Sequence, residues 1–172
     1  MKYWCTRNQD LILINFLTLG AILISYYFTD LRIEILGAIL ATGISLSLGV
    51  RQYKTENDKI FKELFQEFNS KYDIKFNNKL NQIDTLIKSN KEVKLDENDV
   101  ILVIDYLNFC SEEYLWYTKG RIPDMVWTSW ENGMIYFFNL PPINDIILSQ
   151  NSQKTSYYGL FDKTSKRIEN WK

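Results

Sequence analysis

Apolar residues are concentrated in the first fifty positions of the chain, in two runs without a charged side chain. The first run, 11–28, has 18 residues, and the second, 35–50, has 16. A membrane-spanning helix needs about 20 predominantly apolar residues, with a range of roughly 17 to 25. The second run reaches this length over 32–50, where Arg32 and Glu34 are placed to extend toward the lipid–water interface. The pattern therefore predicts two membrane-spanning helices.

Two other interpretations of the first run are weaker. A signal peptide has an apolar core of roughly 7 to 15 residues, whereas this run is longer, follows Asp10 directly and precedes no small-x-small cleavage site. A soluble helical hairpin would have to bury two uncharged runs in the core of a chain of only 172 residues. We therefore expect a transmembrane helical hairpin over 11–50.

The charges beside the two runs predict the orientation of the hairpin. Basic residues stay on the cytoplasmic side of a membrane. The connection between the runs carries Asp30, Arg32 and Glu34, whereas the outer flanks carry Lys2, Arg7, Arg51, Lys54, Lys59 and Lys62. We therefore expect both termini in the cytosol, with the hairpin in the lipid of a bacterial inner membrane.

Small residues recur every four positions in the second run, at Gly37, Ala41, Ser45 and Gly49. In a helix this spacing forms one stripe, and small residues let two helices approach closely within lipid. The stripe could pack only against the first helix of the same hairpin, or it could also pack between protomers. The second possibility predicts a homo-oligomer.

The remaining 122 residues follow a helical pattern. Gly and Pro are sparse after position 50, which disfavours a β-rich domain with many turns. Apolar spacing predicts five or six helices, listed here by range: 55–72, 76–90, 99–119, 123–138, 143–150 and 157–171. The predicted fold is all-α, with a cytosolic N-terminus (1–10), the hairpin (11–50), a stalk or helical connector (51–95) and a cytosolic helical binding domain (96–172).

Several local features of these helices remain open at the sequence level. The first one could continue from the membrane helix as a stalk or turn away near Thr55. Asp96 or Asn98 could cap the third helix, and VILVI at 100–104 could instead form a short buried strand. Gly120 is the expected end of that helix, and LPP at 140–142 is expected to end the next one.

Composition excludes several kinds of chemistry. The chain has no histidine, which excludes catalytic triads and zinc sites that need it, and only two cysteines, which we expect to be reduced. Neighbouring acids such as Glu112 and Glu113 point to different faces of a helix, so we expect them at the solvated surface. We predict no metal, no cofactor and no enzymatic activity. A net charge of −1 gives no attraction for duplex nucleic acid.

Aromatic and basic residues form a cluster between 114 and 138. Aromatic faces stack on nucleic-acid bases, and neighbouring Lys or Arg side chains hold phosphates. A second basic group lies near the carboxyl end, on what we expect to be one helical face. The candidate ligand-binding residues are Tyr117, Lys119, Arg121, Trp127, Trp130, Lys163, Lys166 and Arg167. Trp127 and Trp130 could equally be core residues, and the basic side chains could be ordinary surface.

A two-span N-terminal hairpin followed by a cytosolic helical domain resembles the CRISPR ancillary membrane effectors of type III systems. The segment YLNFCSEEYLWYTKGRIPDMVWTSWENGM, 106–134, also resembles uncharacterised bacterial membrane-tethered helical domains. The first resemblance implies an antiphage effector that binds cyclic tetra-adenylate and perturbs the membrane without bond chemistry. A four-fold ligand suits a ring of identical subunits, so the resemblance implies a tetramer.

Two alternatives from other classes stand beside this expectation. The chain could be a membrane-tethered protein–protein interaction module without a nucleotide ligand, which uses exposed aromatic side chains. It could also be a nuclease, with the acids of DEND at 96–99 and Glu112 as metal ligands.

Overall fold

The computed structural model describes residues 8–28, 32–89 and 93–171, and the regular elements in these ranges are all helical. The predicted all-α class is therefore confirmed. The chain divides into two compact units, Met1–Ile60 and Phe61–Lys172, called below the N-terminal and the C-terminal unit. The expectations for Lys2, Cys5, Arg7 and Asp30 lie outside the described residues.

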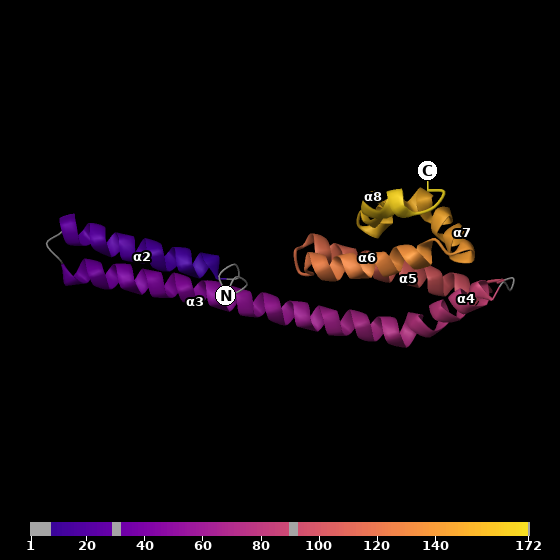
Figure 1. Cartoon of the computed structure of the whole chain (residues 1–172), viewed down its shortest axis with the longest axis horizontal. Helices are drawn as coiled ribbons and strands as arrows, with labels where there is room; N and C mark the ends of the chain where they lie inside the picture. Colours follow the sequence, from indigo (N-terminus) through magenta and orange to yellow (C-terminus); the bar gives the residue numbers. More distant parts are fainter. Residues whose placement is uncertain (1–7, 29–31, 90–92, 172) are drawn as a thin grey trace. The chain divides into compact units, whose positions relative to one another are not determined.

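In the N-terminal unit, α2 (Gln9–Phe28) lies beside the first part of α3 (Ile33–Lys71) (Figure 1). The two helices approach each other closely at Gly43, where an added Cβ would overlap the side chain of Thr18. The hydroxyl of Thr18 donates to the carbonyl oxygen of Ile14 at 2.8 Å, so this polar group is satisfied within its own helix. Gly43 and Thr18 therefore form a close contact between the two helices.

Helix α3 runs without a break for 39 residues, from the second apolar run into the amphipathic segment that follows. The stalk alternative, rather than a turn near Thr55, is therefore the one observed. No Gly or Pro occurs between Gly49 and the end of α3, so nothing in the sequence interrupts its backbone hydrogen bonds. A six-residue π-helix, Tyr72–Asn77, follows directly and leads into α4 (Asn78–Lys88). Such π segments are rare and often occur at functional sites.

The C-terminal unit is organised around α5 (Glu97–Thr118). This helix contacts α6 (Asp124–Phe138), α7 (Pro141–Ser149) and α8 (Leu160–Thr164). Rings from the end of α3 and from the π-helix also pack on it, since Phe68 and Phe76 lie 5.6 and 5.2 Å from the ring of Phe109. The largest fully buried side chains include Trp127, Phe76, Phe138, Phe161, Leu80 and Leu107. The last turns of α3 and α4 therefore belong to the same compact unit as α5 to α8.

The ends of α5 follow from local chemistry. Asp96 is the N-cap: its carboxylate accepts from the backbone N–H of Asp99 at 2.8 Å, and the Asp99 carboxylate accepts from the N–H of Asp96. At the other end Gly120 adopts a positive φ of 68°, and the N–H of Arg121 donates to the carbonyl of Trp116. The VILVI segment is helical, so the strand alternative does not hold.

The predicted end of the fourth helix is confirmed, because α6 stops at Phe138, just before LPP at 140–142. Pro141 and Pro142 then occupy the first turn of α7, where a missing N–H costs no hydrogen bond. The single amphipathic helix expected over 157–171 is absent. Tyr158 and Gly159 have positive φ values of 51° and 84°, which separate a 3₁₀ segment from the five-residue α8, and a second 3₁₀ turn, Ser165–Arg167, follows.

Candidate functional site

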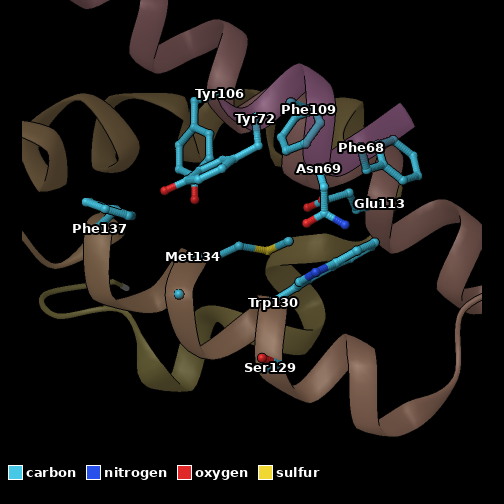
Figure 2. Close-up of a pocket in the computed structure, with 11 residues that line it drawn as sticks. Phe68, Asn69, Tyr72, Tyr106, Phe109, Glu113, Ser129, Trp130, Met134 and Phe137 are labelled. Carbon is cyan, nitrogen blue, oxygen red and sulfur yellow. The ribbon is translucent and has the colours of Figure 1, made fainter. Parts of the chain in front are cut away.

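A half-enclosed cavity of about 170 Å³ lies within the C-terminal unit, between the end of α3, α5 and α6 (Figure 2). Each element contributes several side chains at helical spacing. The lining residues are Phe68, Asn69, Tyr72, Tyr106, Phe109, Glu113, Ser129, Trp130, Gly133, Met134 and Phe137. An apolar cavity of roughly 150 Å³ accommodates benzene. This cavity is therefore large enough for a molecule of a few non-hydrogen atoms.

Aromatic rings form most of the wall of this cavity. Trp130 lies edge-on to Phe68, with the ring centroids 5.9 Å apart, and Phe68 lies edge-on to Phe109 at 5.6 Å. The ring of Tyr106 lies between those of Phe109 and Tyr72, with a centroid distance of 6.3 Å to each. These mutual contacts fix the orientation of the rings. The wall is therefore built before any ligand arrives.

Glu113 brings a carboxyl group into this apolar cavity. Its side chain is only 5% exposed, and Figure 2 shows it beside Asn69, between Phe109 and Trp130. Within the described ranges, no hydrogen bond or ion pair satisfies the Glu113 carboxyl. Burial raises the pKa of Glu113 well above its ordinary value, and the nearby charge of Glu112 adds to the rise.

The other polar groups of the cavity are uncharged amide and hydroxyl groups. Asn69 donates its amide N–H to the carbonyl of Phe65 at 2.7 Å, which leaves its side-chain oxygen as an acceptor. The hydroxyl groups of Tyr72 and Tyr106 point toward α6 (Figure 2). Burial raises the pKa of both phenols, so they remain neutral at physiological pH. No Lys or Arg is among the described residues that line the cavity.

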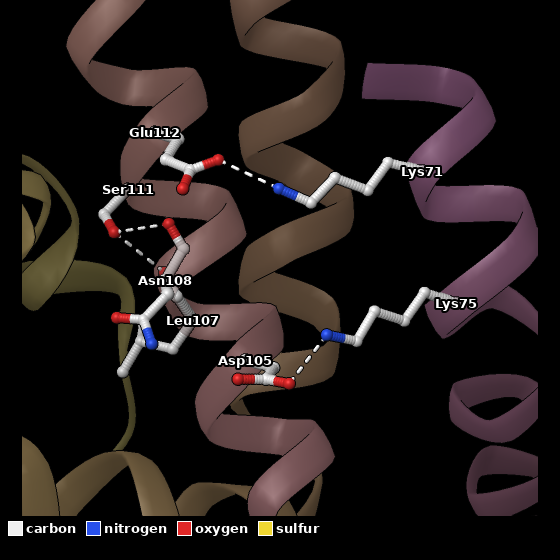
Figure 3. A network of polar contacts seen from close by, with 7 residues as sticks. All are labelled: Lys71, Lys75, Asp105, Leu107, Asn108, Ser111 and Glu112. Atoms are coloured by element: carbon white, nitrogen blue, oxygen red, sulfur yellow. Dashed lines mark hydrogen bonds and ion pairs between the residues drawn. The ribbon is translucent and has the colours of Figure 1, made fainter. Parts of the chain in front are cut away.

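The lysine side chains next to this cavity form ion pairs at the surface. Lys71 and Lys75 reach from the end of α3 and the π-helix to the acids of α5 (Figure 3). Lys71 is 3.0 Å from Glu112, and Lys75 is 2.7 Å from Asp105. Lys71 lowers the pKa of Glu113, but this effect is smaller than that of burial. Glu113 therefore stays apart from the ion pairs beside it.

The solvated surface expected for Glu112 and Glu113 is observed only for the first. Glu113 lies three and seven positions after Cys110 and Tyr106, both of which are buried. This places its carboxyl on the apolar face of α5. The sequence carries this signal in its helical spacing, because Glu113 follows Cys110 and Tyr106 by about one and two turns.

The aromatic candidates for ligand binding are differently placed. Trp127 is 2% exposed, and the ring of Tyr117 stacks on it at 4.9 Å, so Trp127 is a core residue. Trp130 is half-buried and lines the cavity described above. The structure therefore does not join these three rings in one open stacking surface.

The basic candidates are mostly at the surface. Lys119 lies over the ring of Trp116, 4.8 Å from its centroid, and Arg121 is half-buried. Lys163 and Lys166 are exposed and belong to different helical segments, α8 and the 3₁₀ turn after it. The guanidinium group of Arg167 is 3.5 Å from Glu131 and donates to Asn132 at 2.7 Å, so protein groups already occupy it.

The small-residue stripe is not the contact face between α2 and α3. Gly37, Ala41, Ser45 and Gly49 are all exposed, and an added Cβ at Gly37 or Gly49 would meet no atom within 4 Å. The contact uses Gly43 instead. Packing of the stripe against the first helix of its own hairpin, one of the two possibilities, is therefore not what this chain does.

No group of three or more His, Cys, Asp or Glu residues that could hold a metal ion occurs in the described part of the chain. The acids of DEND have another role, since Asp96 and Asp99 form the capping box of α5. Comparison of the chain with protein-family models, curated proteins and solved structures found no match.

Proposed function

We propose that this protein is a membrane-anchored sensor, with the N-terminal unit in the lipid of a bacterial inner membrane and the C-terminal unit in the cytosol. The observation that carries the proposal is the outward-facing apolar surface of the hairpin. Two helices are long and apolar enough to cross a membrane, and 6% and 0% of their apolar stretches are buried. A core helix of a soluble protein would instead bury most of such a stretch.

The aromatic residues at the ends of the hairpin support the same placement. Tyr27 is 86% exposed near the end of α2, and Tyr53 is 66% exposed on α3. From Ile33 to Tyr53 a helix rises about 30 Å, which is the thickness of the hydrocarbon core. Tyrosine is enriched at both interfaces of a membrane. Asp10 and Lys54 pair at 2.5 Å near the end that carries the basic flank, where a charged pair would remain in contact with water.

Membrane placement is tested by fractionating cells that express the full chain. We expect the protein in the membrane pellet after alkaline carbonate extraction, and we expect a C-terminal green fluorescent protein to fluoresce, because the C-terminus is proposed to be cytosolic. A C-terminal alkaline phosphatase fusion, which works only outside the cytosol, should be inactive. Recovery of the intact chain in the aqueous fraction without detergent would contradict the proposal.

Helix α3 is the physical connection between binding and the membrane in this proposal. Its first half carries the exposed apolar surface, and the ring of Phe68 in its last turn packs on Phe109 of α5 in the C-terminal unit. A ligand that displaces the end of a continuous helix acts directly on the segment that continues toward the hairpin. No loop has to transmit the change.

Cyclic oligoadenylate is the ligand class to test first, because the architecture resembles the type III CRISPR ancillary membrane effectors. The full chain in maltoside micelles is heated with and without cyclic tetra-adenylate, cyclic hexa-adenylate or a linear oligoadenylate. A ligand at 100 times its Kd stabilises the folded state by about 2.7 kcal/mol. We expect Lys119→Ala, Arg121→Ala and Lys166→Ala to reduce the shift, and Lys62→Ala, a surface change on α3, to leave it intact.

The interaction module is the second candidate, and the placement of the aromatic residues favours it. Trp127 is buried under Tyr117, and Lys119 covers Trp116, so these faces are not free to stack on bases. Absence of any thermal shift with the three nucleotides would contradict the nucleotide proposal. Capture of one stoichiometric protein partner in that case would support the interaction module.

The exposed stripe on α3 supports self-association in lipid. Gly37 and Gly49 leave open space on one face of the helix, into which a helix of another protomer could pack closely. Gly37→Leu should therefore lower the oligomer number measured by native mass spectrometry from nanodiscs. Gly20→Leu is the matched control, since an added Cβ at Gly20 on α2 also meets no atom within 4 Å. Equal oligomer distributions for the two variants would contradict the role of the stripe.

A further inference from the structure

The carboxyl group of Glu113 is a buried polar group for which the described part of the C-terminal unit supplies no partner. It is 95% buried, by its exposed fraction of 5%, yet it has no hydrogen bond or ion pair among the described residues. A buried carboxyl without a partner destabilises a fold by the cost of its lost hydration. Because it faces a cavity rather than packed side chains, a ligand could supply the missing partner.

The groups around this carboxyl are suited to a positive charge. Six aromatic residues line the cavity, namely Phe68, Tyr72, Tyr106, Phe109, Trp130 and Phe137. The face of an aromatic ring attracts a cation within about 6 Å of its centre. The free side-chain oxygen of Asn69 is an acceptor, and the described lining contains no Lys or Arg. The hydroxyl groups of Tyr72, Tyr106 and Ser129 are neutral, so the lining offers an anion no positive charge.

We propose that the cavity lined by Glu113 binds a small organic cation, a quaternary ammonium or alkylammonium group, held by the carboxylate and surrounded by the aromatic wall. Glu113 holds a proton in the empty cavity and releases it to solvent when the cation binds. The volume of about 170 Å³ fits such a head group and excludes a nucleotide. A bare metal ion is disfavoured, because one carboxylate and one amide oxygen are too few ligands for a hard cation. This site is distinct from the basic residues considered for cyclic oligoadenylate, and it does not depend on where the hairpin lies.

Binding is tested with the full chain in maltoside micelles. The probes are tetramethylammonium and choline, observed by saturation-transfer proton NMR on their methyl groups and by calorimetry. The neutral control is dimethylbutanol, the carbon isostere of choline. We expect both cations to bind and the isostere to bind at least about tenfold more weakly, since it lacks the charge that the carboxylate and the rings recognise. Equal affinities, or no binding of either cation, would overturn the proposal.

Two variants locate the site. Glu113→Gln keeps the size of the side chain and removes the charge, so it should weaken cation binding by about tenfold or more. Glu112→Gln changes the exposed neighbour, which pairs with Lys71, and should bind as the unmodified chain does. Unchanged binding by Glu113→Gln overturns the assignment.

A third variant remains informative if Glu113→Gln does not fold. Gly133 lines the cavity, and an added Cβ there meets no atom within 4 Å, so the Cβ of Gly133→Leu enters open space. Replacing a mid-helix glycine also favours the helix by about 1 kcal/mol. We expect this variant to fold at least as stably and to lose cation binding. Retained binding would show that the cation does not occupy this cavity.

The same cation could be free in solution or the head group of a choline lipid. Nanodiscs made of phosphatidylglycerol and of phosphatidylcholine distinguish the two sources. If free tetramethylammonium binds equally in both, the ligand is a soluble cation. If phosphatidylcholine nanodiscs compete with it, the head group is the occupant. Failure of binding in both contradicts this site alone, because the membrane proposal is decided by fractionation.

Discussion

The two units differ in the exposure of their apolar side chains, which face outward in the first and inward in the second. In the N-terminal unit, Phe16 and Tyr27 are 77% and 86% exposed, whereas Ser25 is 6% exposed. In the C-terminal unit, Phe76 and Phe138 are fully buried. Both units contain many large apolar side chains, so the difference lies in where these side chains point. The difference supports the proposal that the first unit lies in lipid, whereas the second contains its own core.

The largest contrast between the units is expected for the loss of a phenylalanine ring. Phe76→Ala removes a fully buried ring and should lower the free energy of unfolding of the C-terminal unit by about 3–5 kcal/mol. Phe16→Ala removes a ring that is 77% exposed and should leave that unit unchanged. Urea unfolding in micelles, followed by tryptophan fluorescence, measures both. Equal losses would show that the two rings have the same environment.

A charged side chain introduced into the proposed membrane span tests the same comparison in the N-terminal unit. Ile44→Arg places a charge near the middle of the proposed span, which costs about 2.5–3.5 kcal/mol for insertion. Ile74→Arg makes the same change at a residue that is 82% exposed in the C-terminal unit, whereas Ile44 is 60% exposed. We expect only Ile44→Arg to reduce the fraction of protein in the membrane pellet. If neither variant leaves the membrane, α3 does not span it.

Glu113 gives the stability of the C-terminal unit a pH dependence. Its pKa is raised in the folded state, so the folded state holds a proton that the unfolded state releases above the ordinary pKa. Stability should therefore fall as pH rises from that ordinary value through the raised one. Glu113→Gln removes this slope and should raise the free energy of unfolding at neutral pH by about 1 kcal/mol.

Thermal unfolding across pH measures this effect, with Glu112→Gln as the control that keeps the slope. The groups that face Glu113 are Lys71 and Tyr72 from one side, and Tyr106, Cys110 and Glu112 from its own helix. The lining residues from α6 carry no charge. A slope that survives in Glu113→Gln would assign the pH dependence to one of these neighbours.

The longer helices of the C-terminal unit were predictable from apolar spacing, because they bury apolar residues that recur with the helical period. The continuity of α3 was not predictable from the sequence. The absence of Gly and Pro permits an uninterrupted helix but does not require one. The break at Tyr158 and Gly159 was also missed. A positive φ at Tyr158 depends on tertiary contacts, because a tyrosine alone does not favour it.

The candidate site was harder to predict than the fold. Trp130 was named for its ring, but its partners Phe68 and Phe109 come from segments 62 and 21 residues earlier in the chain. Periodicity identifies the face of one helix, and it does not identify which three helices meet. Glu113 was predictable as a member of the apolar face of α5, but only the packing shows that the face encloses a cavity.

The smallest expected effect concerns the ion pairs of the C-terminal unit. Lys75 and Asp105 are 2.7 Å apart, and their side chains are 47% and 41% exposed. Pairs of this kind contribute about 0.2–1 kcal/mol and weaken with salt. A double-mutant cycle with Lys75→Met and Asp105→Asn, measured by urea unfolding at low and high salt, gives the coupling energy. A coupling well above 1 kcal/mol that persists at high salt would mean that the π-helix depends on this pair, rather than on the buried ring of Phe76 beside it.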